Sequence, residues 1–320
     1  MQRLTVPHSG RLLVSQLSAY GLAAVLDTYA EDAFVGHDPS SLEMQPHVLT
    51  PLDAAQSGEL VARSAAECEH MLEADLEPGQ IGNSRRPVMW ARATDSDRGA
   101  VALRAREALL DGEEGRQRML AVALAAGLGA PAAWLSERPQ LGASRLDGVM
   151  GNATSDFVRG VLRRCRPVAA GSAAPYFERA WAGRLGPADT EDKTGWAPPG
   201  TRIDSVHQWL AAVGLTLLPV GLSGSGRGTT PCFWHQRGAR GITLPILSST
   251  AAVARLRALL QRPELLQRPE LSVPPASLSP AHRAKLRALG VSELISFVVN
   301  DRSSSQSVAF SFGRGERTEL

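Results

Sequence analysis

Leu17-Ser-Ala-Tyr-Gly-Leu22 and Leu210-Ala-Ala-Val-Gly-Leu215 share the pattern Leu-(Ser/Ala)-Ala-x-Gly-Leu and begin 193 residues apart. Each lies in a stretch whose apolar residues recur at three- and four-residue spacing. This spacing predicts an amphipathic helix over 11–30 and a second one that begins at an N-cap, Asp204. Glycine inside a helix costs about 1 kcal/mol relative to alanine, a cost that the close approach of another backbone usually offsets. Either each motif is an ordinary packing site, or the two are one structural device used twice.

Length and composition limit the class of protein. The chain has 320 residues, of which 43% are hydrophobic and 21% charged, so it can bury a core and is not globally disordered. No stretch approaches the roughly 18–20 apolar residues of a membrane helix, and the first residues lack the pattern of a secretory signal. The three cysteines lie far apart with no CxxC pair, which argues against a disulfide framework and a cysteine-based zinc site. We expect a cytoplasmic protein with no membrane partner.

Charge is distributed unevenly along the chain, although the formal net charge is only +2. Residues 1–80 carry a net charge of −9, residues 81–150 of +2 and residues 151–320 of +9. All but two of the 34 basic residues are arginines. A GC-rich genome accounts for this usage, but guanidinium groups also grip phosphate in a bidentate way. A polyanion would be attracted to the basic part, and the acidic part could equally be where a basic protein docks.

The order of helices, short strands and turns predicts a helix-rich α+β fold with short antiparallel strands and hairpins. We expect two lobes, an acidic one over 1–150 and a basic one over 151–320, with the boundary within 128–152. In the second lobe, hairpins are predicted from 232–236 and 242–247, joined across 237–241, and from 294–300 and 308–312. Further expected elements are helices over 52–76, 99–127, 152–166, from an N-cap at Thr250 to 261 and near 280–289, a strand near 44–49 and a strand-like run over 215–220.

No catalytic signature is present. Gly221–Gly228 is glycine-rich, but the residues after it are typical of a strand, not of the helix N-terminus that a phosphate-binding loop requires. The seven histidines include no HExxH motif and no pair at metal-ligand spacing, and no Gly-x-Ser-x-Gly elbow occurs. His37-Asp38 matches two letters of a metal-phosphohydrolase pattern, and chance is the default interpretation. We therefore expect neither an enzyme nor a metal or cofactor site.

Several arginines are candidates for contact with nucleic acid. In the helix predicted over 152–166, three arginines lie on one face because they are three and four residues apart. This face is either an ordinary solvated surface or a positive stripe that a polyanion would neutralise. The stretch Phe233–Gly241 predicts a hairpin with aromatic residues at its base and two arginines at its tip, which can present cations to phosphates and a planar side chain to bases. The candidate nucleic-acid-binding residues are Arg85, Arg86, Arg159, Arg163, Arg164, Arg166, Arg227, Gln236, Arg237 and Arg240.

The two ends of the chain also carry a resemblance to a known family. The features are the motif at Leu17–Leu22 and, late in the chain, Trp209-Leu-Ala-Ala-Val-Gly-Leu-Thr-Leu-Leu-Pro219, a Gly/Arg loop, Cys232-Phe-Trp-His235 and Leu244-Pro-Ile-Leu247 before an Ala/Leu helix. With these features the chain resembles the short form of the large subunit of type I CRISPR effector complexes, in the variety of types I-U and I-G. The resemblance covers about the first 30 residues and residues 205–260.

This resemblance implies a non-catalytic subunit of a Cascade-type antiviral defence complex, at one end of a crRNA–protein filament. Its partners would be crRNA, target double-stranded DNA, the backbone and crRNA-end subunits, and the helicase-nuclease recruited on target binding. There it would help to recognise the short motif beside the target (the PAM) and hold displaced DNA, while guide pairing reads the sequence. The alternative is a scaffold or regulatory protein that docks a basic partner through its acidic N-terminal lobe.

Overall fold

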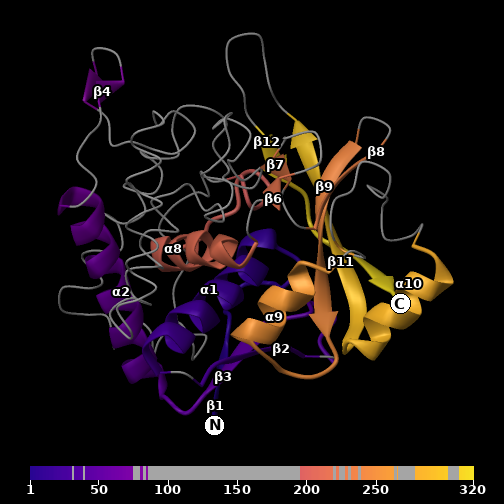
Figure 1. Cartoon of the computed structure of the whole chain (residues 1–320), viewed down its shortest axis with the longest axis horizontal. Coiled ribbons are helices and arrows are strands. Elements are labelled where there is room, and N and C mark those ends of the chain that lie inside the picture. Colours follow the sequence, from indigo (N-terminus) through magenta and orange to yellow (C-terminus); the bar gives the residue numbers. More distant parts are fainter. Residues whose placement is uncertain are drawn as a thin grey trace.

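The protein has an α+β fold in which helices pack with antiparallel sheets, as the sequence predicts (Figure 1). The fold is seen in a computed structural model. It describes residues 1–30, 32–38, 40–74, 80–81, 84–85, 195–218, 221–222, 228–229, 232–236, 239–262, 265, 278–301 and 310–320.

The first sheet is built mainly from the N-terminal part of the chain. It contains β1 (Gln2–Thr5), β2 (Phe34–His37), β3 (Pro46–Thr50) and β10 (Ala251–Ala252), in the order β1-β3-β2-β10. All neighbours are antiparallel. Because β3 lies between β1 and β2, the connection through α1 forms a split β-α-β unit. The expected strand near 44–49 is confirmed as β3, whereas β1, β2 and β10 were not predicted from the sequence.

The second sheet contains both predicted hairpins. It is formed by β8 (Phe233–Gln236), β9 (Ala239–Leu247), β11 (Val291–Asp301), β12 (Phe310–Phe312) and β13 (Glu316–Glu319). One prediction about the first hairpin is wrong: β9 begins at Ala239, and Arg240 pairs with His235 in the ladder rather than lying in a connecting loop. Two small pairs complete the described strands: β4 (Gln80–Ile81) with β5 (Ser84–Arg85), and β6 (Gly221–Leu222) with β7 (Gly228–Thr229).

The two glycine motifs pack against each other. They lie in α1 (Leu13–Ala30) and α8 (Ser205–Gly214). A Cβ atom on Gly21 would lie 1.7 Å from the carbonyl oxygen of Leu210, and one on Gly214 would lie 2.0 Å from that of Leu17. Each glycine therefore receives the carbonyl of the first residue of the other motif. The contact is reciprocal, so the interpretation as one structural device used twice holds.

Helix α1 is buried on every side over residues 13–26, not only along one stripe. The stretch 12–26 carries no charged residue, and a helix that is apolar all round belongs in a core. Around α1 lie the first sheet, α8, α2 (Ala54–Ala74) and α9 (Val253–Leu260). The core also takes residues from the second sheet and from α10 (Pro280–Ala288). It includes residues from both predicted lobes, whose boundary at 128–152 lies outside the described residues.

Two expectations about local structure are wrong. Thr250 does not cap α9, because Ala252 occupies the cap position, and Ala251 and Ala252 pair with β2 as β10. The run that follows α8 is not a strand but a 3-10 turn, η3 (Leu215–Leu217), in which Leu215 and Leu217 are buried. The helices predicted over 52–76 and near 280–289 are confirmed as α2 and α10, and those over 99–127 and 152–166 lie outside the described residues.

Gly21→Ala is expected to destabilise the protein by about 3 kcal/mol or more, because the added methyl group meets a backbone carbonyl that cannot move aside. The matched control is Gly313→Ala, whose methyl group would find its nearest neighbours at an ordinary 3.6 Å. The measurement is the free energy of unfolding from urea denaturation. Equal effects of the two substitutions would contradict the role given to the glycine contact.

Candidate functional sites

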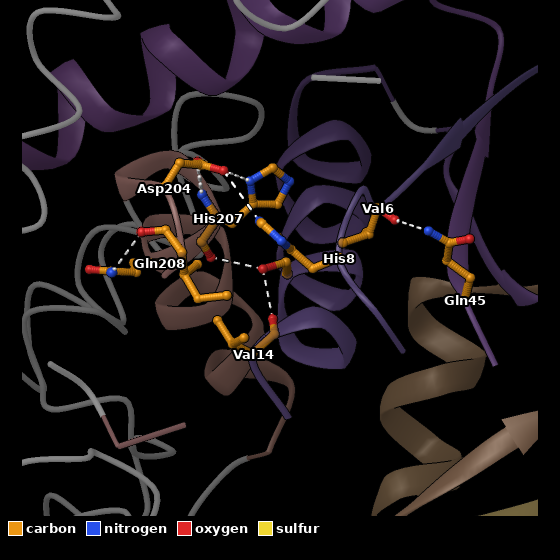
Figure 2. A network of polar contacts seen from close by, with 9 residues as sticks. Val6, His8, Val14, Gln45, Asp204, His207 and Gln208 are labelled. Atoms are coloured by element: carbon orange, nitrogen blue, oxygen red, sulfur yellow. Dashed lines mark hydrogen bonds and ion pairs between the residues drawn. The ribbon is translucent and has the colours of Figure 1, made fainter. Parts of the chain in front are cut away.

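Three polar side chains meet where the loop before α1 passes the start of α8 (Figure 2). They are His8, Asp204 and His207, and we call them the histidine–aspartate cluster. Asp204 Oδ2 lies 2.5 Å from His207 Nδ1 and 3.4 Å from His8 Nε2. The two imidazole rings stand edge to face with centroids 5.0 Å apart. One carboxylate oxygen is thus shared between two imidazoles.

Asp204 is held in place by its role at the end of the helix. It is the N-cap of α8, as predicted, and its Oδ1 accepts a hydrogen bond of 2.9 Å from the backbone N–H of His207. Burial opposes ionisation of this carboxyl, but the charge of His207 and hydrogen bonds from His207 and His8 outweigh it. The pKa of Asp204 therefore lies well below its usual value. Because an ionised carboxylate only accepts hydrogen bonds, His207 Nδ1 and His8 Nε2 are both donors.

Hydrogen bonds on both sides fix the relative positions of the loop and the helix. The loop is attached to β3 and its neighbour Gln45, because Val6 N–H donates to Pro46 O at 3.1 Å and Gln45 Nε2 donates to Val6 O at 2.9 Å. The hydroxyl of Ser18 in α1 donates to the carbonyl of His207 at 2.8 Å. The cluster is therefore supported by the packing of α1 on α8.

The donor set of the cluster is two imidazole nitrogens and one carboxylate oxygen, and all three ligand atoms lie within 4.8 Å of one another. Such a set can bind a transition-metal ion or share protons. Sequence reasoning missed it, although Asp204-x-x-His207 placed a carboxylate and an imidazole in the first turn of one helix. No sequence signal connects His8, which is 196 residues away from Asp204.

His37 has a structural role in the described part of the chain. Its Nδ1 accepts the backbone N–H of Leu247 at 3.2 Å, so the proton is on Nε2, which donates to Gln16 Oε1 at 2.9 Å. Gln16 in turn donates to the carbonyl of Gly10 at 2.8 Å. Burial and then the nearby His47 lower the pKa of His37 to about 3. His37 thus joins the two sheets and α1 as a neutral hydrogen-bonding residue.

A second candidate site is the basic face of α9 and α10. Arg255 and Arg257 in α9, and Lys285 and Arg287 in α10, are exposed, and neither helix contains an acidic residue. The guanidinium Nη2 of Arg255 donates to the carbonyl of Leu289 at 3.1 Å, which joins α9 to the residue that caps the C-terminal end of α10. Among the described residues, no carboxylate forms an ion pair with Arg255, Arg257 or Arg287.

The structure describes only some of the nucleic-acid-binding residues that the sequence suggests. Arg85 lies in β5, Gln236 ends β8 and Arg240 lies in β9 opposite His235. The aromatic base of this hairpin differs from the prediction. The side chain of Trp234 is 7% exposed and covers Gly241, where a Cβ atom would lie 2.6 Å from the indole, so Trp234 is a core residue and not a platform for bases. The remaining candidates lie outside the described residues: Arg86, Arg159, Arg163, Arg164, Arg166, Arg227 and Arg237.

The stability of the protein is expected to fall as the pH is lowered from about 6.5 towards 3. His37 has a pKa of about 3 in the folded protein against an ordinary value of 6.5, so in this window only the unfolded chain takes up its proton. His37 then contributes a slope of about 1.4 kcal/mol per pH unit. His37→Asn keeps an acceptor for the N–H of Leu247 but cannot titrate. Urea unfolding between pH 7 and 4 should give a shallower slope for this variant, and an unchanged slope would contradict the assignment.

Comparison with models of known protein families gives no match, and neither does comparison with curated proteins. No helix in the described ranges combines the length and the apolar character that crossing a membrane requires.

Proposed function

We propose that the chain is a non-catalytic, nucleic-acid-binding subunit of a type I CRISPR RNA-guided complex, and that α9 and α10 bind the phosphate backbone. The observation that carries the binding proposal is the basic face, whose two helices bear exposed cations and no carboxylate. The assignment to a CRISPR complex is supported by the sequence resemblance over the first 30 residues and over 205–260.

The physical argument for a polyanion starts from the charges that have no described counter-ion. Arg257 and Arg287 are exposed, and elsewhere on the described surface arginines are used differently: Arg3 pairs with Asp38 at 3.0 Å, and Arg314 with Glu43 at 3.4 Å. Like charges on neighbouring helices repel one another, and phosphates that replace condensed counter-ions relieve this repulsion. Such contacts position a nucleic acid without reading its sequence.

The division of labour in the proposed complex rests on the sequence resemblance. Guide pairing would supply sequence specificity, and this subunit would contact the backbone of crRNA or target DNA through α9 and α10. A contribution to recognition of the flanking motif would need contacts to base edges in addition. Its protein partners would be the backbone and crRNA-end subunits and the recruited helicase-nuclease. Arg240 and Gln236, on the β8–β9 hairpin, remain candidates for contact with the same nucleic acid.

The double variant Arg257→Ala/Arg287→Ala is expected to weaken binding to duplex DNA at least tenfold, or by about 1.4 kcal/mol, whatever the sequence. The slope of log K against log salt should become shallower by about 0.9 for each phosphate group that the variant no longer neutralises. The matched control is Arg3→Ala/Arg314→Ala, which removes the same charge from arginines that are paired with carboxylates. The measurement is fluorescence anisotropy at several salt concentrations. Equally weakened binding in both double variants would contradict a specific role for α9 and α10.

Purification of the tagged chain from its native host under mild salt tests the assignment to a complex. We expect co-purifying short RNAs of repeat–spacer type, together with the other effector subunits. A preparation whose 260/280 ratio shows no nucleic acid, and whose partner is a basic protein, would overturn the proposal in favour of a scaffold.

A further inference from the structure

We propose that His8, Asp204 and His207 form a binding site for a divalent transition-metal ion of the zinc class. The ion would join the loop before α1 to the first turn of α8. The site lies apart from α9 and α10, so this inference does not depend on nucleic-acid binding.

The distances in the cluster are close to those that a metal ion needs. Zinc binds imidazole nitrogen at about 2.0–2.1 Å and carboxylate oxygen at about 2.0–2.2 Å, which places neighbouring ligand atoms of a tetrahedron about 3.3 Å apart. Asp204 Oδ2 and His8 Nε2 are already 3.4 Å apart. Asp204 Oδ2 and His207 Nδ1 are 2.5 Å apart and must separate by less than about 1 Å, which a rotation of the carboxylate provides.

The chemistry of the donors selects the class of ion. Two imidazole nitrogens with one carboxylate suit Zn²⁺ and Fe²⁺, whereas Mg²⁺ and Ca²⁺ prefer a shell of oxygen atoms. The side chains of Asp204 and His207 are 6% and 1% exposed, and that of His8 is 22% exposed. The ion would therefore be reached from the side of His8, where a water molecule can complete the coordination.

Binding exchanges protons for the metal in a defined way. His207 Nδ1 and His8 Nε2 carry the protons that they donate to the ionised Asp204. A metal ligand must present a lone pair, so each of these nitrogens gives up its proton, and a charged imidazole ring releases that proton to solvent. Asp204 keeps Oδ1 on the backbone N–H of His207, so the N-cap of α8 survives metal binding.

The alternative is a cluster that is complete without metal, in which the carboxylate simply shares two imidazole protons. The two forms differ in the interaction that holds the loop at His8 against α8. In the metal form the loop at His8 is tied to α8 by a bond to a common ion, whereas in the proton-sharing form only a 3.4 Å hydrogen bond joins them.

The test uses the full chain with a tag that contains no histidine, stripped of metal by a chelator that is then removed. Zn²⁺, anaerobic Fe²⁺ and Mg²⁺ are titrated separately by calorimetry, and Co²⁺ serves as a spectroscopic probe of coordination. We expect one equivalent of Zn²⁺ or Fe²⁺ to bind, no heat from Mg²⁺, visible Co²⁺ bands typical of nitrogen and oxygen ligands, and a higher unfolding temperature with the bound ion.

His8→Ala and Asp204→Asn should each weaken binding by at least the roughly 10- to 100-fold that the loss of an outer-sphere partner costs. Asp204→Asn keeps an oxygen that can cap α8, so the variant should stay folded. His282→Ala, on α10, is the matched control and should bind like the wild type. Wild-type protein that binds no transition metal would overturn the proposal in favour of the proton-sharing cluster. Equal affinity in His8→Ala and the wild type would also overturn it, by placing the ion elsewhere.

Discussion

The contact between Gly21 and Gly214 is the constraint on which the arrangement of the other elements depends. Two helices approach so closely that carbonyl oxygens occupy the places where Cβ atoms would be. At this distance no side chain separates the backbones, so the rotation and translation of α8 on α1 have little freedom. Since α1 also contacts the first sheet, α2 and α9, the position of α8 is fixed relative to most of the core. The cost of about 1 kcal/mol for each helical glycine is offset by this packing.

The same contact determines the geometry of the histidine–aspartate cluster. His8 belongs to the loop before α1, while Asp204 and His207 begin α8, so their separation follows from how the two helices pack. The hydrogen bond from Ser18 to the carbonyl of His207 adds a polar contact at this end of the pair. Chemistry that requires ligand atoms within an ångström of their positions is thus supported by the closely packed pair of helices α1 and α8.

Sequence reasoning succeeded where the signal is local. Helices α1 and α2, the N-cap Asp204 and both hairpins follow from periodicity, capping chemistry and turn residues. It failed where contacts between residues far apart in the sequence determine the local structure. Strand β10 has two residues and exists because β2 offers a free edge, which displaced the cap expected at Thr250. Trp234 was expected to be available for bases but is buried over Gly241, the residue that pairs with it on β9. The proximity of His8 to Asp204 could not be predicted for the same reason, since the two residues are 196 positions apart in the sequence.

The two candidate sites make different demands on the fold. Backbone binding by α9 and α10 needs exposed cations in roughly the right place, and a shift of an ångström changes little because phosphate contacts are long-range and tolerant. Metal binding needs three atoms to converge, and the same shift would abolish it. Helix α9 packs on α1 and η3, so both sites share one support. A small disturbance of the α1–α8 contact should therefore affect the cluster long before it affects the basic face, whereas global unfolding removes both together.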